Sequence, residues 1–240
     1  MTEDRPGPEP REVAVALSNP AEPGRAGPVA DLIAGRLGLP LRVVHVDAVA
    51  EDDPEPVARA LLALIGPDTL LVAGSGRASR WSGKRSVVEH VVDGRHGLVL
   101  AVGGRARIAD RAGPVLVALN GSEGAESAIV VADRLARALA TDVLLCLVAP
   151  DDGDPAVTPD GARGDAAAYL ESVAGPDRRS VVLRANDHIA AMTAEAERSD
   201  CPLVVLVSRG DRSVERSTIS RTSSGLIDEA GCPVLVVETA

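Results

Sequence analysis

The chain has 240 residues, a formal net charge of −10 at pH 7 and 45% apolar residues, but only 1% aromatic residues and no phenylalanine. This length and apolar content suit two domains of ordinary size whose cores are built from Val, Leu, Ile and Ala. We do not expect nucleic acid as a partner, because the acidic chain would repel phosphate groups and offers almost no aromatic rings on which bases could stack.

Residues 1–10 are polar and rich in proline, which predicts a disordered N-terminus. Neither this stretch nor any other holds an apolar run long enough for a signal peptide or a membrane span. We therefore expect a cytoplasmic protein with no membrane partner. The three cysteines lie in or beside apolar runs without metal-ligand spacing, a pattern typical of buried thiols in a reducing compartment.

The first half of the chain alternates strand and helix patterns. Short apolar runs predict strands at Glu12–Leu17, Leu41–Val46, Thr69–Ala73 and Leu98–Val102. Helices are expected at Val29–Leu37, Pro56–Ile65 and Val87–Val92. A glycine-containing segment, 74–86, separates the third strand from the last helix.

The second half follows the same alternation with one more strand and one more helix. Strands are predicted from Val115 and at Val143–Val148, Ser180–Leu183, Leu203–Val207 and Val234–Val237. Two helices are expected near Glu126–Ala140 and Asp165–Ala174. A third should begin after a cap at Asn186 or Asp187 and end at Arg198, and a short fourth should contain Leu226, Ile227 and Ala230. Strands that alternate with helices predict parallel α/β sheets.

The two halves are an internal repeat of unequal length. The strand at Val13 matches the strand at Val115, an offset of 102 residues, and Leu41 matches Val143 at the same offset. Further along, Leu70 matches Leu203, and the offset has grown to 133, a difference of 31 residues. The first repeat therefore lacks about one helix and one strand.

The stretch from Leu203 onward resembles the C-terminal half of a universal stress protein domain, in which a strand, a glycine loop and a helix precede a final Cys-Pro-Val-Leu-Val-Val strand, here Cys232–Val237. The family loop has Gly, two residues, Gly, nine residues and Gly-Ser. Counting back from Cys232, Val207 stands at the first glycine, Gly210 at the second, and Ser220 and Arg221 at the Gly-Ser pair.

The resemblance covers residues 11–239 and implies an α/β fold of two tandem doubly wound, Rossmann-like parallel-sheet domains. We place a shortened first domain at 11–104, a linker at 105–112 and the second domain at 113–240. In the family the last strand pairs antiparallel with its counterpart across a pseudo-twofold axis. Here Leu98–Val102 and Val234–Val237 would form that pair within one chain, giving a pseudo-dimer that we also expect to form a homodimer.

The resemblance implies an adenine nucleotide such as ATP as the ligand, at the carboxyl ends of the parallel strands. Nucleotide-binding members have an acidic residue after the first strand, where this chain has Ser18 and Asn120. The candidate site in the second half consists of Asn120, Gly121, Ser122, Val148, Ser208, Gly210, Ser220, Arg221, Thr222 and Ser223. The alternative is a polar loop that caps its helix with Thr222 or Ser223.

A second candidate anion site lies in the first half, at Gly74, Ser75, Gly76, Gly83, Lys84, Arg85 and Ser86. Lys84, the only lysine of the chain, would contact phosphate there, although a surface lysine needs no such role. The segment is not a P-loop of the NTPase type, because Ala78 replaces the first glycine and Arg85 replaces the Ser or Thr that binds magnesium.

No catalytic or metal-binding pattern accompanies these loops. The four histidines have none of the short spacings of a zinc site, and no Ser-His-Asp or Cys-His arrangement can be assembled from the order of residues. We expect a protein that is not an enzyme, has no metal and requires no cofactor. Two functions are favoured: a stress-response regulator that senses an adenine nucleotide, or an interaction scaffold of the same fold that binds none. A third, a slow ATP hydrolase, is disfavoured because no base or magnesium ligand is evident.

Overall fold

The computed structural model describes residues 9–17, 24–46, 54–66, 68–75, 86–93, 97–108, 111–151, 166–176, 178–208 and 221–238. The described strands are β1 (Glu12–Leu17), β2 (Leu41–His45), β3 (Thr69–Gly74), β4 (Leu98–Val102), β5 (Val115–Leu119), β6 (Val143–Ala149), β7 (Arg179–Arg184), β8 (Val204–Ser208) and β9 (Val234–Glu238). They form one nine-stranded sheet in the order β2-β1-β3-β4-β9-β8-β5-β6-β7.

Helices cover both faces of this sheet. They are α1 (Ala26–Leu37), α2 (Pro54–Leu64), α4 (Val87–Asp93), α5 (Glu123–Leu139), α6 (Ala166–Ala174), α7 (His188–Arg198) and α8 (Arg221–Glu229). One core lies under α1, α5 and α6, with Ile33, Leu135 and Leu170 among its members. The other lies under α2, α4, α7 and α8 and includes Leu61 and Leu226.

The centre of the sheet joins the two halves. All described strand pairs are parallel except β4 and β9, which run antiparallel with Leu100 opposite Leu235. Both strands are buried along their whole length, as expected for apolar strands covered on two faces. The predicted antiparallel pairing of the two terminal strands within one chain is therefore present.

The halves repeat each other outward from that centre. The order β4-β3-β1-β2 on one side corresponds to β9-β8-β5-β6 on the other, and β7 has no counterpart. Since α2 and α7 both pack in the same core, α6 is the helix without a counterpart among the described helices. The tandem α/β architecture and the shortening of the first half by one helix and one strand are confirmed.

Local sequence signals account for most element boundaries. The start of α7 is capped by Asp187, whose carboxylate accepts a hydrogen bond from Ala190 N at 3.0 Å, which selects one of the two predicted caps. Helix α5 begins earlier than predicted, because Ser122 is its N-cap. Helix α1 is followed by Gly38 as its C-cap, and the φ of 65° at Gly38 is the left-handed conformation that favours glycine.

The segment between the halves, predicted as a linker, contacts the second half. Arg107 N donates to the carbonyl oxygen of Gly231 at 2.9 Å, and the Arg111 guanidinium lies 2.7 Å from the Glu197 carboxylate. Burial lowers the pKa of Arg111, but the hydrogen bond to Glu197 together with the negative charges around it raises that pKa overall. The contacts show that this segment is held against the end of α7 and the loop before β9.

The cysteines are buried, free thiols. Burial raises the pKa of Cys146, Cys201 and Cys232 to about 12 in each case, with the nearby Glu195 carboxylate adding to the effect on the first two. A thiol with such a pKa stays protonated at neutral pH and reacts slowly. The prediction that the cysteines are small buried hydrophobic residues without disulfide bonds is confirmed.

Candidate functional site

The second-half candidate residues meet at the carboxyl ends of β5 and β8. From β5 the chain crosses by α5 to β6 on one side, whereas β8 lies on the other side, so the strand order reverses between β5 and β8. Ligands of open α/β sheets bind in the crevice at such a point. Ala118 is paired with Leu206, which brings Asn120, just beyond β5, level with Ser208 at the end of β8.

The turn after β5 has a defined geometry. The Asn120 side-chain oxygen accepts hydrogen bonds from Ser122 N at 3.1 Å and from Ser122 Oγ at 2.7 Å. Gly121 between them has φ 81°, a conformation that disfavours any residue with a Cβ. Ser122 is buried, and its Oγ accepts a hydrogen bond from Ala125 N at 3.4 Å, which caps α5.

Asn120 itself is exposed at this edge of the sheet. Because its side-chain oxygen is held by Ser122, the side chain is oriented by the turn, and its amide nitrogen makes no hydrogen bond to the described residues. The turn therefore presents an oriented amide NH₂ group, with two N–H donors, at the point where the strand order reverses. A donor in this position can bind a ring nitrogen of a base or a hydroxyl of a sugar.

The residues expected to contact the phosphate groups are less exposed to solvent than Asn120. Ser208 is 6% exposed and Ser223 is 2% exposed. Helix α8 begins at Arg221, so Thr222 and Ser223 lie within its first turn and neither is the cap. The expectation that one of them caps the helix is wrong, because the helix starts before both. Gly210 and Ser220 lie outside the described residues.

Helix α8 nevertheless contributes an N-terminus to this half. The first N–H groups of a helix have no partner within the helix and carry partial positive charge, which suits an anion. Val148, the remaining candidate, is half-buried on β6 and packs against the core under α7. The structure thus brings together the Asn120 turn and the end of β8, and Val148 serves packing.

The first-half candidates are divided by the undescribed segment. Gly74 ends β3, and Ser75 N donates to the carbonyl oxygen of Val102 at 3.0 Å, which extends the pairing with β4. Gly76, Gly83, Lys84 and Arg85 lie outside the described residues. The role of the lone lysine and of these glycines stays a prediction.

Ser86 forms a capping box that the sequence analysis missed. Glu89 N donates to Ser86 Oγ at 3.2 Å, and Ser86 N donates to the Glu89 carboxylate at 2.6 Å. The signal was present in the order Ser-Val-Val-Glu, since Ser followed three residues later by Glu is typical of this motif. The first N–H of the α4 region is therefore occupied by Glu89, which leaves less of this helix end for an anion.

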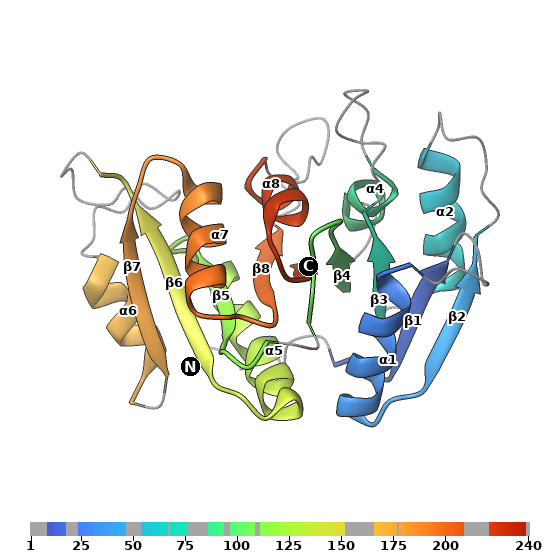
Figure 1. Ribbon diagram of the computed structural model, residues 1–240, viewed down its shortest axis with the longest axis horizontal. Coiled ribbons are helices and arrows are strands. Elements are labelled where there is room, and N and C mark those ends of the chain that lie inside the picture. The colour runs from blue at the N-terminus through green and yellow to red at the C-terminus, as the bar shows by residue number, and fades with distance from the viewer. Residues whose placement is uncertain are drawn as a thin grey trace.

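Glu89 also joins the two halves. Its other carboxylate oxygen accepts a hydrogen bond from Ser224 Oγ at 2.7 Å, between residues 135 positions apart. Figure 1 shows α4 and α8, the helices that carry these side chains, next to each other above the central strands. The last helices of the two halves, each of which follows a candidate loop, are thus in direct polar contact.

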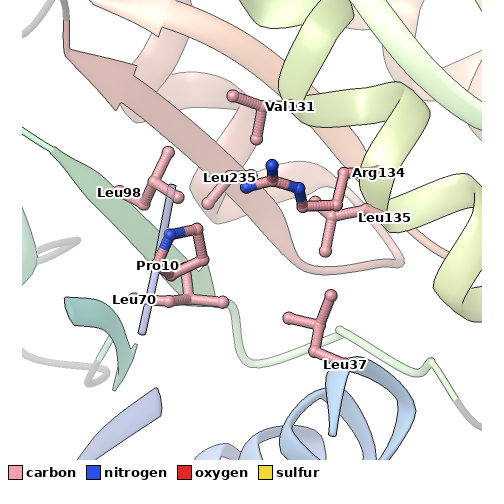
Figure 2. Close-up of a pocket in the computed structure, with 8 residues that line it drawn as sticks. All are labelled: Pro10, Leu37, Leu70, Leu98, Val131, Arg134, Leu135 and Leu235. Atoms are coloured by element: carbon pink, nitrogen blue, oxygen red, sulfur yellow. The ribbon is translucent and has the colours of Figure 1, made fainter. Parts of the chain in front are cut away.

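A small pocket lies on the opposite face of the central strands. Its lining residues, shown in Figure 2, are Pro10, Leu37, Leu70, Leu98, Val131, Arg134, Leu135 and Leu235. The volume is about 10 Å³, which is close to the least that one water needs. This pocket is too small and too apolar for a nucleotide, and it contains none of the predicted site residues.

Neither a metal-binding cluster nor a membrane-spanning helix is found among the described residues. They contain no group of three His, Cys, Asp or Glu side chains placed to hold a metal ion. None of the described helices combines the length and the apolar character that crossing a bilayer requires. What the described residues define is an α/β protein with two halves, in which the Asn120 turn lies beside the carboxyl end of β8.

This chain belongs to the universal stress protein family. The model of that family matches residues 112–238, which lie in the second half. The match confirms the resemblance found at Leu203–Val237, including the region where two loop glycines are replaced. A search of the curated proteins finds no match.

Solved structures with the same fold cover nearly the whole chain. A functionally unknown protein from Pseudomonas aeruginosa PAO1 is 13% identical with a TM-score of 0.65, covering 95% of this chain and 92% of that one. A universal stress protein from Archaeoglobus fulgidus DSM 4304 is 17% identical with a TM-score of 0.58, covering 95% and 88%. The cytoplasmic domain of a prokaryotic cation chloride cotransporter is 11% identical with a TM-score of 0.51, covering 95% of each chain. At these identities the likeness shows the fold.

Proposed function

We propose that this protein is a cytoplasmic stress-response regulator that binds an adenine nucleotide, with ATP as the first candidate, in its second half. Membership of the universal stress protein family supports the stress-response role. The observation that supports nucleotide binding is the geometry of the turn after β5. Ser122 orients the Asn120 side chain there, at the point where the strand order reverses. The proposal is binding without catalysis.

Different parts of the site would bind different groups of the nucleotide. The Asn120 amide would donate to the adenine ring or to a ribose hydroxyl. The N-terminus of α8, which starts at Arg221, would receive phosphate groups through main-chain N–H donors. The net charge of −10 makes this local source of positive potential important, because the protein as a whole repels an anionic ligand.

The test is the thermal unfolding midpoint of the purified chain with and without millimolar Mg-ATP, with GTP and cyclic AMP as comparisons. A ligand at a hundred times its dissociation constant adds about 2.7 kcal/mol to the stability, which is readily measured as a shift in the midpoint. The expected result is a shift that is selective for ATP. Gly210→Val should abolish it and Lys84→Ala should leave it unchanged.

A variant at Asn120 tests the carrying observation directly. Asn120→Asp keeps an oxygen that can accept from Ser122, so the turn survives, but it replaces the amide N–H donor with a second carboxylate oxygen. We expect a smaller ATP shift for Asn120→Asp than for the wild type, because the N–H donor that the proposal assigns to Asn120 is lost. A shift that Lys84→Ala removes and Asn120→Asp does not alter would move the site to the first half.

The second candidate function is an interaction scaffold of the same fold. It is favoured by the burial of Ser208 and Ser223, since two hydroxyls that the nucleotide site would use are turned away from solvent. Val207 also stands where the family loop has a glycine. If none of the three nucleotides shifts the unfolding midpoint, the nucleotide proposal fails, and capture of protein partners becomes the next experiment.

A further inference from the structure

The outer strand of the first half is exposed where its counterpart in the second half is buried. Val43 on β2 corresponds to Leu145 on β6 at the repeat offset of 102 residues. Val43 is 45% exposed, whereas Leu145 is 0% exposed. In Figure 1, β7 and α6 lie beyond β6, and no described element lies beyond β2. The missing helix–strand unit therefore leaves a sheet edge that none of the described residues covers with another strand.

The main chain of β2 is oriented for one more strand. Val13 N donates to the carbonyl oxygen of Pro40, and Val46 N donates to Leu17, each at 3.0 Å, so even-numbered residues here direct their main-chain groups toward β1. Main-chain groups of successive residues in a strand point to opposite sides. The N–H and C=O groups of Leu41, Val43 and His45 therefore point away from β1, toward the open edge.

Along this edge Leu41 and Val43 are apolar, Arg42 is paired with an acidic residue, and His45 is exposed. The Arg42 guanidinium lies 2.6 Å from the Glu12 carboxylate and donates to the carbonyl oxygen of Leu64 at 2.9 Å. Leu64 is itself 55% exposed. Val43 and Leu64 are thus two of the three large hydrophobic residues that stand exposed among the described residues, the third being Val130 on α5. Apart from the His45 imidazole, the described residues of β2 therefore lack the unpaired charges that normally prevent pairing.

The opposite edge of the sheet has such protection. Strand β7 begins with Arg179 and ends with Arg184, and both are exposed. Neither makes an ion pair with the described residues, so a β7 edge that met another copy of itself would gather unpaired positive charge. The central strands β4 and β9 are already paired with each other. Of the sheet positions described, β2 is the one suited to joining two copies.

We propose that two copies of this chain associate through β2, in an antiparallel pair centred on Val43. In this register Val43 of one copy faces Val43 of the other, and Leu41 faces His45. Residues in a hydrogen-bonded antiparallel pair exchange both N–H···O bonds, and the outward main-chain groups of Val43 satisfy that requirement. The pairing is isologous and closes after two copies. It does not depend on nucleotide binding.

The first measurement is the mass of the full chain by sedimentation velocity, over concentrations from about 1 µM to about 1 mM, because a five-residue ladder makes a small interface of modest affinity. The mass should rise from the 24.6 kDa of one chain toward twice that value. A chain that stays monomeric throughout, or one that grows without limit by joining β2 to β7, would overturn the proposal.

A charge at the centre of the pair gives the decisive variant. Val43→Lys places two like charges opposite each other, and we expect association weakened at least about tenfold. Val130→Lys is the matched control, because Val130 is 48% exposed on α5 and outside the proposed contact. Since both side chains are already exposed, both variants should keep the wild-type circular dichroism spectrum. A dimer that survives Val43→Lys would contradict the proposal.

Mixing two variants then tests the register. Val43→Lys and Val43→Glu should each be monomeric alone, and their equimolar mixture should form a mixed dimer, because only a contact of position 43 with itself brings opposite charges together. If the mixture stays monomeric while wild type dimerises, the pair is not centred on Val43, and the proposed register is wrong.

Discussion

The two halves of this protein share a strand order but end differently, and the difference is visible in the sequences of β2 and β6. Strand β6 is a continuous apolar run and is buried along its length except at Val148, because β7 lies beside it and helices cover both of its faces. Strand β2 interrupts its apolar residues with Arg42 and His45 and is mostly exposed or half-buried. Loss of the α6–β7 unit in one half has turned an interior position into an edge.

That comparison separates two roles of one repeat position. Leu145 contributes to a core, whereas Val43 presents the same sheet face to solvent, and only the presence of the next unit distinguishes them. A strand position in a tandem protein therefore cannot be assigned to core or surface from its counterpart alone. It must first be known whether another helix–strand unit lies beside that strand.

The largest expected effect on stability comes from replacing Leu145 with alanine, and it is compared with the same change at its counterpart Val43. Leu145→Ala should lower the free energy of unfolding by about 2–5 kcal/mol, because it leaves a cavity in a closely packed core. Val43→Ala should change it by less than about 0.5 kcal/mol, because the side chain is already half in water. Urea denaturation of the monomer at low protein concentration measures both. Similar losses for the two variants would show that β2 is covered in solution.

Most of the fold could be predicted from the sequence because its signals are local or repetitive. Apolar runs predicted the strands, and the change of offset between Val13–Val115 and Leu70–Leu203 predicted the missing unit. The pairing of β4 with β9 could be predicted only through the family resemblance, since no local pattern connects residues so far apart. The capping box at Ser86 was a local signal that was overlooked.

The candidate site could be predicted less completely, for a physical reason. Side-chain burial depends on packing, so the sequence placed Ser208 at the right strand end without indicating that it is only 6% exposed. Thr222 and Ser223 are good caps in isolation, yet α8 starts before them. The mutual hydrogen bonds of Asn120 and Ser122 are short-range and agree with the predicted turn, whereas the Glu89–Ser224 contact joins distant segments and could not be foreseen.

The second prediction tests the joint between the halves by adding one methyl group. A Cβ on Gly103, just after β4, would clash with the main-chain carbonyl oxygen of Ile227 on α8. Gly103→Ala should therefore destabilise the protein by about 1–3 kcal/mol, because main-chain atoms of the other half must move.

Its matched control is the next residue. A Cβ on Gly104 meets nothing within 4 Å, so Gly104→Ala should leave the urea midpoint nearly unchanged or raise it slightly. Both substitutions reduce the freedom of the unfolded chain in the same way, and the difference between them isolates the contact with α8. Equal midpoints would mean that the halves are not closely packed at this point.

The smallest expected effect concerns the hydrogen bond between Ser224 and Glu89. Ser224→Ala should cost about 0.5–1.5 kcal/mol through loss of that bond, partly offset because Ala favours a helix more than Ser does. Ser172→Ala in α6 controls for the helix term, since the Ser172 hydroxyl donates only to the Tyr169 carbonyl of its own exposed helix surface. Single variants alone do not isolate the contact, because Glu89 also caps α4 with Ser86.

A double-mutant cycle with Glu89→Ala and Ser224→Ala resolves this, because the effect on the α4 cap is common to two arms and cancels. A coupling of about 0.5–1.5 kcal/mol would show that the last helices of the two halves stabilise each other across the centre. Additive losses would mean that each half closes on its own core and that the antiparallel β4–β9 pair, not the helices above it, carries the connection.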